Sequence, residues 1–152
     1  MTVQTMMASV SNVQLVELHH YFEANGDLIV MERVDKVPFA VERVFVVRAP
    51  LGAVRGQHAH QRCAQFLVCT NGCVEVICDD GVSTATFLLN RPELALVLPP
   101  SIWSQQTYQR TDSVLTVLCD RPYEAADYIR DYEEFLAYRK LSSGPERMKW
   151  TS

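Results

Sequence analysis

Short runs of alternating apolar and polar residues, separated by tight-turn signals, are the feature that most limits how this chain can fold. Asn-Gly occurs at 25–26 and 71–72, and Asp-Gly at 80–81, and these dipeptides favour two-residue hairpin turns. In CVEVIC (73–78) the even-numbered residues share one face and the odd-numbered residues the other, which predicts a strand with one face in a core. The predicted strands are VQLVEL (13–18), LIVME (28–32), VERVFVV (41–47), AQFLVC (64–69), CVEVIC (73–78), STATFLL (83–89), LALVLP (94–99) and SVLTVLC (113–119).

The period changes in the C-terminal segment. In YEAADYIRDYEEFLAYRKL (123–141) apolar residues recur at helical spacing, Pro122 precedes the segment, and acidic residues crowd its beginning. We therefore predict a helix over 124–140, followed by a frayed tail. Many short strands at regular spacing indicate an all-β sandwich or barrel. The whole chain, 1–152, is expected to be one domain with a β core over about 13–120.

The composition excludes two classes of partner. Hydrophobic residues make up 48% of the chain and charged residues 21%, as in globular proteins, and the net charge is −4. Without clustered Lys and Arg we expect no nucleic-acid binding, and no apolar run approaches the ~18 residues of a membrane span. The N-terminus lacks the pattern of a secretory signal. Five cysteines, an odd number with no CxxC pair, are expected to be reduced thiols in a cytoplasmic protein.

Two of the four histidines lie one residue apart, and their spacing makes them the candidate reactive groups. His58 and His60 occur in VRGQHAHQRCAQF (54–66), beside Arg55. On a strand, residues i and i+2 point to the same face about 6.6 Å apart. The pair is then a set of metal ligands, an acid/base pair, or two ordinary residues of an edge strand.

The spacing around the pair follows a known motif with one change. Five residues separate Gly52 from His58, and one separates His58 from His60. Four residues then separate His60 from Gln65, and six separate Gln65 from Gly72. This resembles the first motif of the cupin superfamily, with Gln65 in the place of a glutamate. The resemblance implies a small double-sheet β-barrel of the cupin or jelly-roll type, carrying a C-terminal α-helix.

The second cupin motif falls on PPSIWS (99–104), where Ser101 replaces a glycine and Ser104 replaces a histidine. Metal-bearing cupins use three histidines and a glutamate, so two of four ligands are changed here. An amide and a hydroxyl are poor substitutes for a carboxylate and an imidazole on a divalent ion. We therefore expect no metal and no other cofactor, and two histidines left for proton transfer.

Several strings resemble one cupin subgroup, the WxcM-like nucleotide-sugar 3,4-ketoisomerases. They are VPFAVERVF (37–45), RGQHAH (55–60), QFLVCTNGCVEVICDDG (65–81) and YEAADYIRDYEEF (123–135), in the order found in that family. The resemblance implies a metal-independent isomerase that moves the keto group of a dTDP-4-keto-6-deoxyhexose from C4 to C3, ahead of transamination to an amino sugar. It also implies a homodimer with exchanged N-terminal strands.

Positions that match the family assign the candidate site. His58 and His60 are the expected acid/base pair acting through an enediol, with His60 as the base. Arg43 and Arg55 match arginines near the nucleotide sugar, where a guanidinium suits a diphosphate. The remaining candidates for substrate binding are Gln65, Trp103, Ser104 and Asn25. For both arginines the alternative is a solvated strand-end residue, and for Trp103 it is a core tryptophan.

The match fails at a position where the family carries a tyrosine thought to shuttle a proton. Here the residue is Phe45, which has no proton to give or accept. Replacements that we consider are Tyr21, Tyr108, or a water held by Ser104. Ser104 and Asn25 also differ from the family and leave open the configuration produced at C4.

Three other functions compete with the isomerase. A non-catalytic cupin that binds a nucleotide sugar would explain the missing tyrosine, and a related proton-transfer enzyme with altered specificity would explain the changes at Ser104 and Asn25. A metal-dependent cupin oxygenase is the third possibility. Turnover separates the first two from the isomerase, and metal analysis separates the third.

Overall fold

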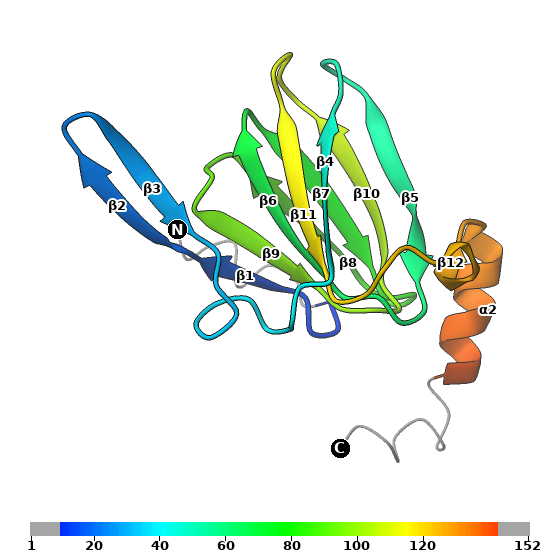
Figure 1. The fold of residues 1–152 in the computed structure, drawn as a ribbon. Helices are drawn as coiled ribbons and strands as arrows, with labels where there is room; N and C mark the ends of the chain where they lie inside the picture. Colours follow the sequence, from blue (N-terminus) through cyan, green and yellow to red (C-terminus); the bar gives the residue numbers. More distant parts are fainter. Residues whose placement is uncertain (1–9, 143–152) are drawn as a thin grey trace.

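The computed structural model describes residues 10–142, which form two facing β-sheets with a protruding hairpin and a C-terminal helix (Figure 1). The strands are β1 (Gln14–Glu17), β2 (His19–Glu23), β3 (Gly26–Val30), β4 (Arg43–Arg48), β5 (Val54–His60), β6 (Gln65–Asn71), β7 (Val74–Asp79), β8 (Thr84–Leu89), β9 (Leu94–Leu98), β10 (Trp103–Tyr108), β11 (Val114–Cys119) and β12 (Tyr128–Ile129). The helices are a 3-10 turn, η1 (Ala125–Asp127), and α2 (Tyr132–Ser142).

Each main sheet has five antiparallel strands, in the orders β1-β9-β6-β11-β4 and β12-β5-β10-β7-β8. The main core lies between them, because the inward residues of both sheets are apolar and fully buried, among them Leu67, Val76, Leu96 and Leu115. The two five-stranded sheets face each other, which confirms the expected double-sheet cupin architecture. They do not join into one closed sheet. Within the described residues, the only α-helix is too short to cross a membrane.

All eight runs predicted as strands form strands, although their ends shift by a few residues. In β7 the burial alternates as expected: Val74, Val76 and Cys78 are buried, whereas Glu75 and Ile77 are only half-buried. The sequence pattern did not indicate β2, β10 or β12, whose residues are mostly polar or aromatic. The five cysteines are free thiols, and all but Cys73 are buried.

The β2–β3 hairpin projects from the body of the protein (Figure 1). Its side chains Tyr21, Phe22 and Leu28 are exposed. The predicted N-terminal strand 13–18 contains β1, which pairs with β9 of the same chain. Within one chain, therefore, the hairpin and not β1 is the N-terminal element with few contacts to the sheets.

The C-terminal helix begins eight residues later than predicted, at Tyr132 and not at 124. Residues 125–127 form the 3-10 turn, and Tyr128 and Ile129 pair with His60 and Ala59 at the edge of β5. The helix is capped by Asp131, whose carboxylate accepts a hydrogen bond from the backbone amide of Glu134 at 3.1 Å. The expected frayed tail lies outside the described residues.

Candidate active site

A bulge in β5 brings Arg55 and the histidines to the same side of the sheet. Residues three apart on a regular strand face opposite sides. Here the register against β10 shifts between Ser104 and Gln105, so one extra β5 residue is accommodated near Gln57. Gly56 and Gln57 both have positive φ, 87° and 59°. As a result Arg55 and His58 line one cavity between the sheets.

Gly56 is required at this bulge for two reasons. Its φ of +87° disfavours a side chain, and an added Cβ would lie 2.6 Å from Oε1 of Gln106 and 3.0 Å from the backbone oxygen of Ser104. The glycine in RGQHAH therefore allows β10 to approach β5 closely, and it sets the direction of the histidine that follows.

The cavity has a volume of about 220 Å³ and lies between the inner faces of the two sheets. The polar groups that line it come from several elements and include Arg55, His58 and Gln65. Phe45, Val47 and other apolar residues of the facing sheet cover the opposite side. A polar end with cationic groups and an apolar wall suits a ligand that joins a sugar to an anionic group.

His60 lies beside His58, with ring centroids 5.0 Å apart, and is 5% exposed. Its Nδ1 lies 3.2 Å from Oδ2 of Asp127, which is also buried. Because a carboxylate only accepts, Nδ1 carries the proton, and Nε2 of neutral His60 keeps its lone pair. This Nε2 is buried and has no hydrogen-bond partner within residues 10–142.

Both imidazoles are held neutral. Burial lowers the pKa of His58 to about 4, and the nearby His60 and Arg130 act in the same direction. Burial also lowers the pKa of His60, although the contact with Asp127 opposes this. The Nδ1 of His58 lies 3.1 Å from the carbonyl oxygen of Gly56, which leaves its Nε2 as an acceptor too. At neutral pH the site therefore presents two bases.

Next to the histidines, a guanidinium is fixed by a thiol. Nη2 of Arg43 lies 3.5 Å from Sγ of Cys119, and Nε2 of Gln65 lies 3.8 Å from the same sulfur. A hydrogen bond from the Cys63 thiol, together with Arg43, keeps the pKa of Cys119 below its ordinary value despite burial. This cluster connects Arg43 to the cavity-lining Gln65 and fixes both side chains.

The structure brings together only part of the candidate set. Arg55, His58 and Gln65 line the cavity, His60 lies directly behind them beside His58, and Arg43 contacts Gln65's neighbour Cys119 at the cavity edge. Ser104 is buried directly across from His58 in the β5–β10 ladder, where its hydroxyl accepts a hydrogen bond from Gln106.

Two candidates lie elsewhere. Trp103 was expected near the sugar, but it precedes the inward Ser104 and faces outward, where it packs on Tyr132 and Phe135 under α2. This packing favours the core interpretation of Trp103. Asn25 lies at the turn of the protruding hairpin and not at this chain's own cavity.

Three residues of the site were missed by the sequence reasoning: Asp127, Tyr128 and Arg130. They lie in the segment wrongly predicted as helix, and β12 places them against β5. The ring centroid of Tyr128 is 4.9 Å from that of His58 and 4.3 Å from that of His60, and Cζ of Arg130 lies 4.2 Å from its ring. The D-x-x-E capping pattern starting at Asp131 was the available signal, because it marks a helix start after these residues.

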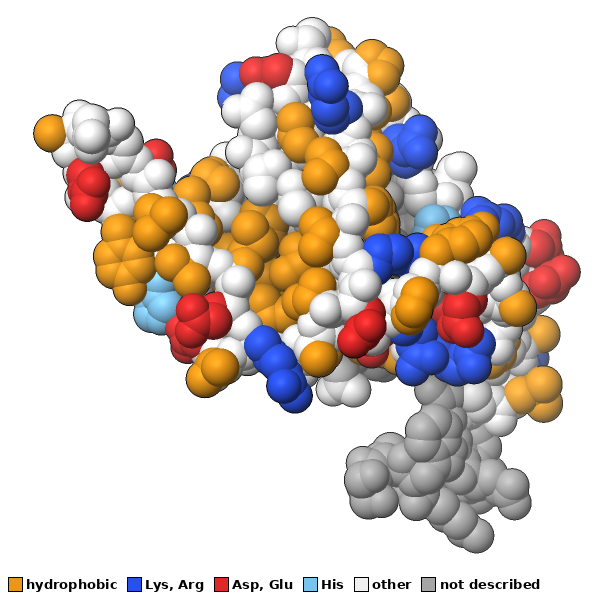
Figure 2. Space-filling model, viewed as in Figure 1, with side chains coloured by type: hydrophobic (Ala, Val, Ile, Leu, Met, Phe, Trp, Pro, Cys, Tyr) orange, Lys and Arg blue, Asp and Glu red, His pale blue; other side chains and the backbone are white. Residues whose placement is uncertain are grey.

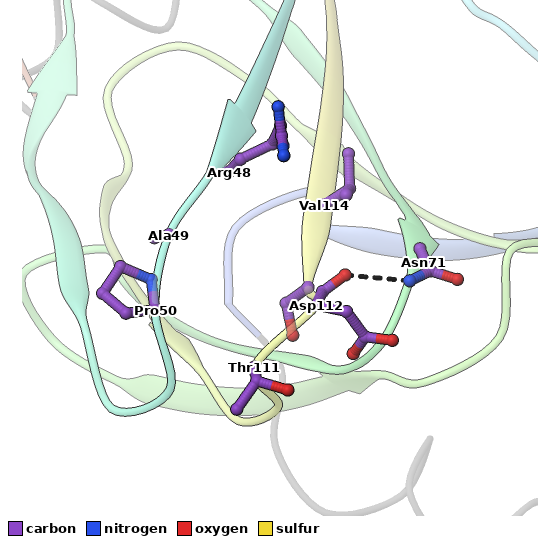
Figure 3. A pocket seen from close by; sticks show the side chains of 8 residues that line it. Arg48, Ala49, Pro50, Asn71, Thr111, Asp112 and Val114 are labelled. Carbon is purple, nitrogen blue, oxygen red and sulfur yellow. Dashed lines mark hydrogen bonds between the residues drawn. The ribbon is translucent and has the colours of Figure 1, made fainter.

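A second hollow, with a volume of about 480 Å³, lies between the β4–β5 and β10–β11 loops, at the other end of the sheets (Figure 3). Arg48 and Asp112 are its charged residues, and a hydrogen bond of 2.9 Å joins Nδ2 of Asn71 to the Asp112 carbonyl. Although larger, this hollow is lined by no histidine, so the smaller cavity is the candidate for proton chemistry.

Among the described residues, one cluster has the composition of a metal site: donor atoms of His60, Cys63 and Asp127 lie within 4.8 Å of one another. The Asp127 oxygens are already engaged, because Oδ1 accepts from the Arg62 amide at 2.7 Å and Oδ2 from the Cys63 amide at 3.1 Å and from His60. A cation there would displace these bonds. The cluster fits a carboxylate that orients an imidazole better than it fits a metal centre.

Two facing sheets with an H-x-H pair beside an internal cavity define a cupin-type protein. A model of the FdtA family, described as WxcM-like, C-terminal, matches residues 11–140, and the chain belongs to this family. It is 32% identical over 126 residues to a TDP-4-oxo-6-deoxy-alpha-D-glucose-3,4-oxoisomerase of Aneurinibacillus thermoaerophilus, a match that covers 82% of this chain and 91% of the relative.

Solved structures give the same result. The sugar 3,4-ketoisomerase QdtA of Thermoanaerobacterium thermosaccharolyticum, in complex with TDP, has a TM-score of 0.84 at 28% identity, covering 90% of this chain and 100% of that one. The TDP-quinovose 3,4-ketoisomerase WlaRB of Campylobacter jejuni has a TM-score of 0.80 at 32% identity, covering 84% and 99%. A histidine-to-asparagine variant of QdtA was solved with TDP-4-keto-6-deoxyglucose and has a TM-score of 0.84 at 27% identity, covering 89% and 99%.

Proposed function

We propose that this protein is a 3,4-ketoisomerase of a dTDP-linked 4-keto-6-deoxyhexose, and that His58 and His60 carry the proton transfers. The observation that carries the proposal is two neutral imidazoles, 5.0 Å apart, beside a cavity of about 220 Å³ between the sheets. The activities of the relatives support the substrate class. The structure with bound TDP-4-keto-6-deoxyglucose is that of a relative with the same fold.

The reaction needs a proton removed from C3 and a proton delivered to C4. A neutral imidazole takes the C3 proton, and the electrons move to the C4 carbonyl to give a 3,4-enediol, which collapses to the 3-keto sugar when C4 is protonated. His60 is the proposed base, because its Nε2 lone pair is uncommitted and Asp127 stabilises the imidazolium that forms. His58 assists from the cavity wall.

Arg55 and Arg130 line the cavity, and Arg43 lies beside it, so the diphosphate is assigned to these guanidinium groups. Gln65, held by Cys119, presents its amide oxygen to a sugar hydroxyl. The proposed reaction uses no metal, because Gln65 and Ser104 occupy the positions of two cupin ligands and the Asp127 oxygens are engaged. Near-stoichiometric metal in protein purified without chelator would contradict this part.

We also propose that the protein acts as a homodimer, with the N-terminal strands exchanged as the β2–β3 hairpin. Phe22 and Leu28 of the hairpin are 74% and 60% exposed. Val44 and Val46 on the outer face of β4 are exposed as well. Hydrophobic side chains gather between the hairpin and the outer face of the sheet (Figure 2), a surface that a second copy would cover. Asn25, at the hairpin turn, would then lie against the partner.

The direct test of function is incubation of purified protein with dTDP-4-keto-6-deoxyglucose, with the products identified by NMR. We expect the 3-keto isomer, formed at an initial rate that grows with enzyme concentration. A non-catalytic nucleotide-sugar-binding cupin would bind TDP in calorimetry and leave the sugar unchanged. That outcome would refute the isomerase and favour the second function.

A further inference from the structure

We propose that Tyr128 is the phenol of this site, and that its hydroxyl exchanges protons with the sugar oxygens during isomerisation. This inference rests on the proposed function. The imidazoles account for the protons on carbon, but O4 must also gain a proton and O3 must lose one. Phe45 lines the cavity without a hydroxyl, so this task falls to another group.

The placement of Tyr128 fits the task. The β12 strand pairs Tyr128 with His60 in the β5 ladder, so the backbone fixes the side chain beside the imidazoles. Its ring contacts both of them, at 4.9 Å and 4.3 Å between centroids. Tyr128 and His58 line the same cavity, so a sugar that reaches one also reaches the other.

Two guanidinium groups hold this phenol. Cζ of Arg130 lies 4.2 Å from its ring centroid. Burial disfavours the charge of Arg43, but its contact with Cys119 and the nearby Tyr128 outweigh it and raise the pKa of Arg43. A guanidinium donates and never accepts, so neither arginine takes the phenolic proton, and the Tyr128 O–H can donate into the cavity that it lines. The same cations stabilise the phenolate when the proton has left.

Other described tyrosines are less suited to this role. Tyr108 lines the cavity and its hydroxyl is buried, but it lies four residues beyond Ser104 on β10, roughly 13 Å along the strand from the position across His58. Tyr21 lies on the hairpin, exposed. Tyr123 packs on Tyr128 and Arg43, but it is mostly exposed and does not line the cavity.

The protons balance over the reaction. The C3 proton goes to an imidazole while the Tyr128 proton goes to O4, which gives the enediol, an imidazolium and a phenolate. The imidazolium then protonates C4, and the O3 proton returns to the phenolate as the 3-keto group forms. The imidazole and the Tyr128 phenol both return to their starting protonation states, and no oxidant or reductant is required.

The test compares Tyr128→Phe with the matched variant Tyr123→Phe, which removes a hydroxyl from the neighbouring ring outside the cavity. We expect Tyr128→Phe to lower kcat by about 10²–10³-fold with KM changed less than about threefold, and Tyr123→Phe to leave both near wild type. A Tyr128→Phe protein that is folded and retains wild-type kcat would overturn the assignment. A wild-type protein without turnover would instead overturn the proposed function.

A second measurement removes the dependence on a well-folded Phe variant. Fluorotyrosine incorporated at Tyr128 keeps the ring and the hydroxyl but lowers the pKa of the phenol. If the phenol is the proton donor, the alkaline limb of the kcat profile moves to lower pH. An unchanged alkaline limb would contradict the assignment, because a packing role does not depend on the pKa of the hydroxyl.

Discussion

At the scale of single residues, the chemistry depends on how each imidazole is oriented. Asp127 accepts from Nδ1 of His60, and the carbonyl of Gly56 accepts from Nδ1 of His58. These two contacts select the tautomer whose Nε2 is a base, and burial keeps both rings neutral. Asp127 also accepts hydrogen bonds from the backbone amides of Arg62 and Cys63. The same buried carboxylate therefore holds the 61–63 turn and sets the tautomer of His60.

The Asp127→Asn variant tests this connection. The amide NH₂ that replaces one oxygen faces donors, so we expect the His60 ring to take the other tautomer, with its proton on Nε2. We predict a loss of kcat of about 10²–10⁴-fold and a loss of stability of about 1–3 kcal/mol. Steady-state kinetics and urea unfolding measure the two effects, and ¹⁵N NMR of the imidazole reports the tautomer. An active variant with an unchanged tautomer would refute the role given to Asp127.

At the scale of elements, β5 and β12 position the site. The β5 bulge places Arg55 on the cavity side, and its outward Ala59 is covered by Ile129 and Phe135. Because β12 adds to the edge of β5, the short segment 127–130 carries three residues of the candidate site. A mutation at the bulge should therefore disturb stability and the cavity together.

Gly56→Ala and Gly52→Ala form a matched pair for this point. Both glycines have a φ of +87°, but a Cβ at Gly52 would meet nothing within 4 Å, whereas at Gly56 it would collide with Gln106 and the Ser104 backbone. We expect Gly52→Ala to lower the free energy of unfolding by about 1 kcal/mol and Gly56→Ala by about 2–4 kcal/mol. Urea unfolding measures both. Equal losses of unfolding free energy in the two variants would show that the close approach of β10 to Gly56 does not contribute to stability.

The sequence predicted much of the β architecture and less of the site. Alternating or β-branched apolar runs identified eight strands, because most of their inward residues are apolar. β10 was missed because WSQQTY turns polar groups such as Gln106 into the cavity, which removes the apolar alternation. The helix was extended too far because Tyr128 and Ile129 fit a helical spacing by chance, while the pairing that decides their structure is with β5, distant in sequence.

At the scale of the whole molecule, the exposed apolar side chains of the hairpin and of the outer sheet face support the proposed dimer. A hairpin alone is at best marginally stable in water, and this one contacts the sheets mainly near its base. In an exchanged dimer the apolar hairpin side chains would be buried. Asn25 and Ser104 lie on different elements of the chain, the hairpin turn and β10.

Phe22→Asp and Leu28→Asp test the dimer. Both side chains are exposed in the single chain, so the change costs little unless a partner covers them. We predict that sedimentation at micromolar concentration gives twice the chain mass for the wild type and a monomer for each variant. Val82→Asp, at a side chain 93% exposed in the β7–β8 turn, should remain a dimer. A monomeric wild type would contradict the exchange of hairpins.

The central claim is that an imidazole moves the proton between C3 and C4, and isotope exchange tests it most directly. dTDP-4-keto-6-deoxyglucose is incubated in deuterium oxide with the wild type and with His60→Asn, and TDP binding by calorimetry shows that both proteins are folded. We predict that the wild type forms the 3-keto product with deuterium at C4 only in the fraction of turnovers in which the imidazolium exchanges its proton with solvent, the remainder carrying the hydrogen from C3, and that His60→Asn loses isomerisation by at least about 10²-fold with TDP binding retained. A His60→Asn protein that forms the isomer at the wild-type rate would contradict the central claim.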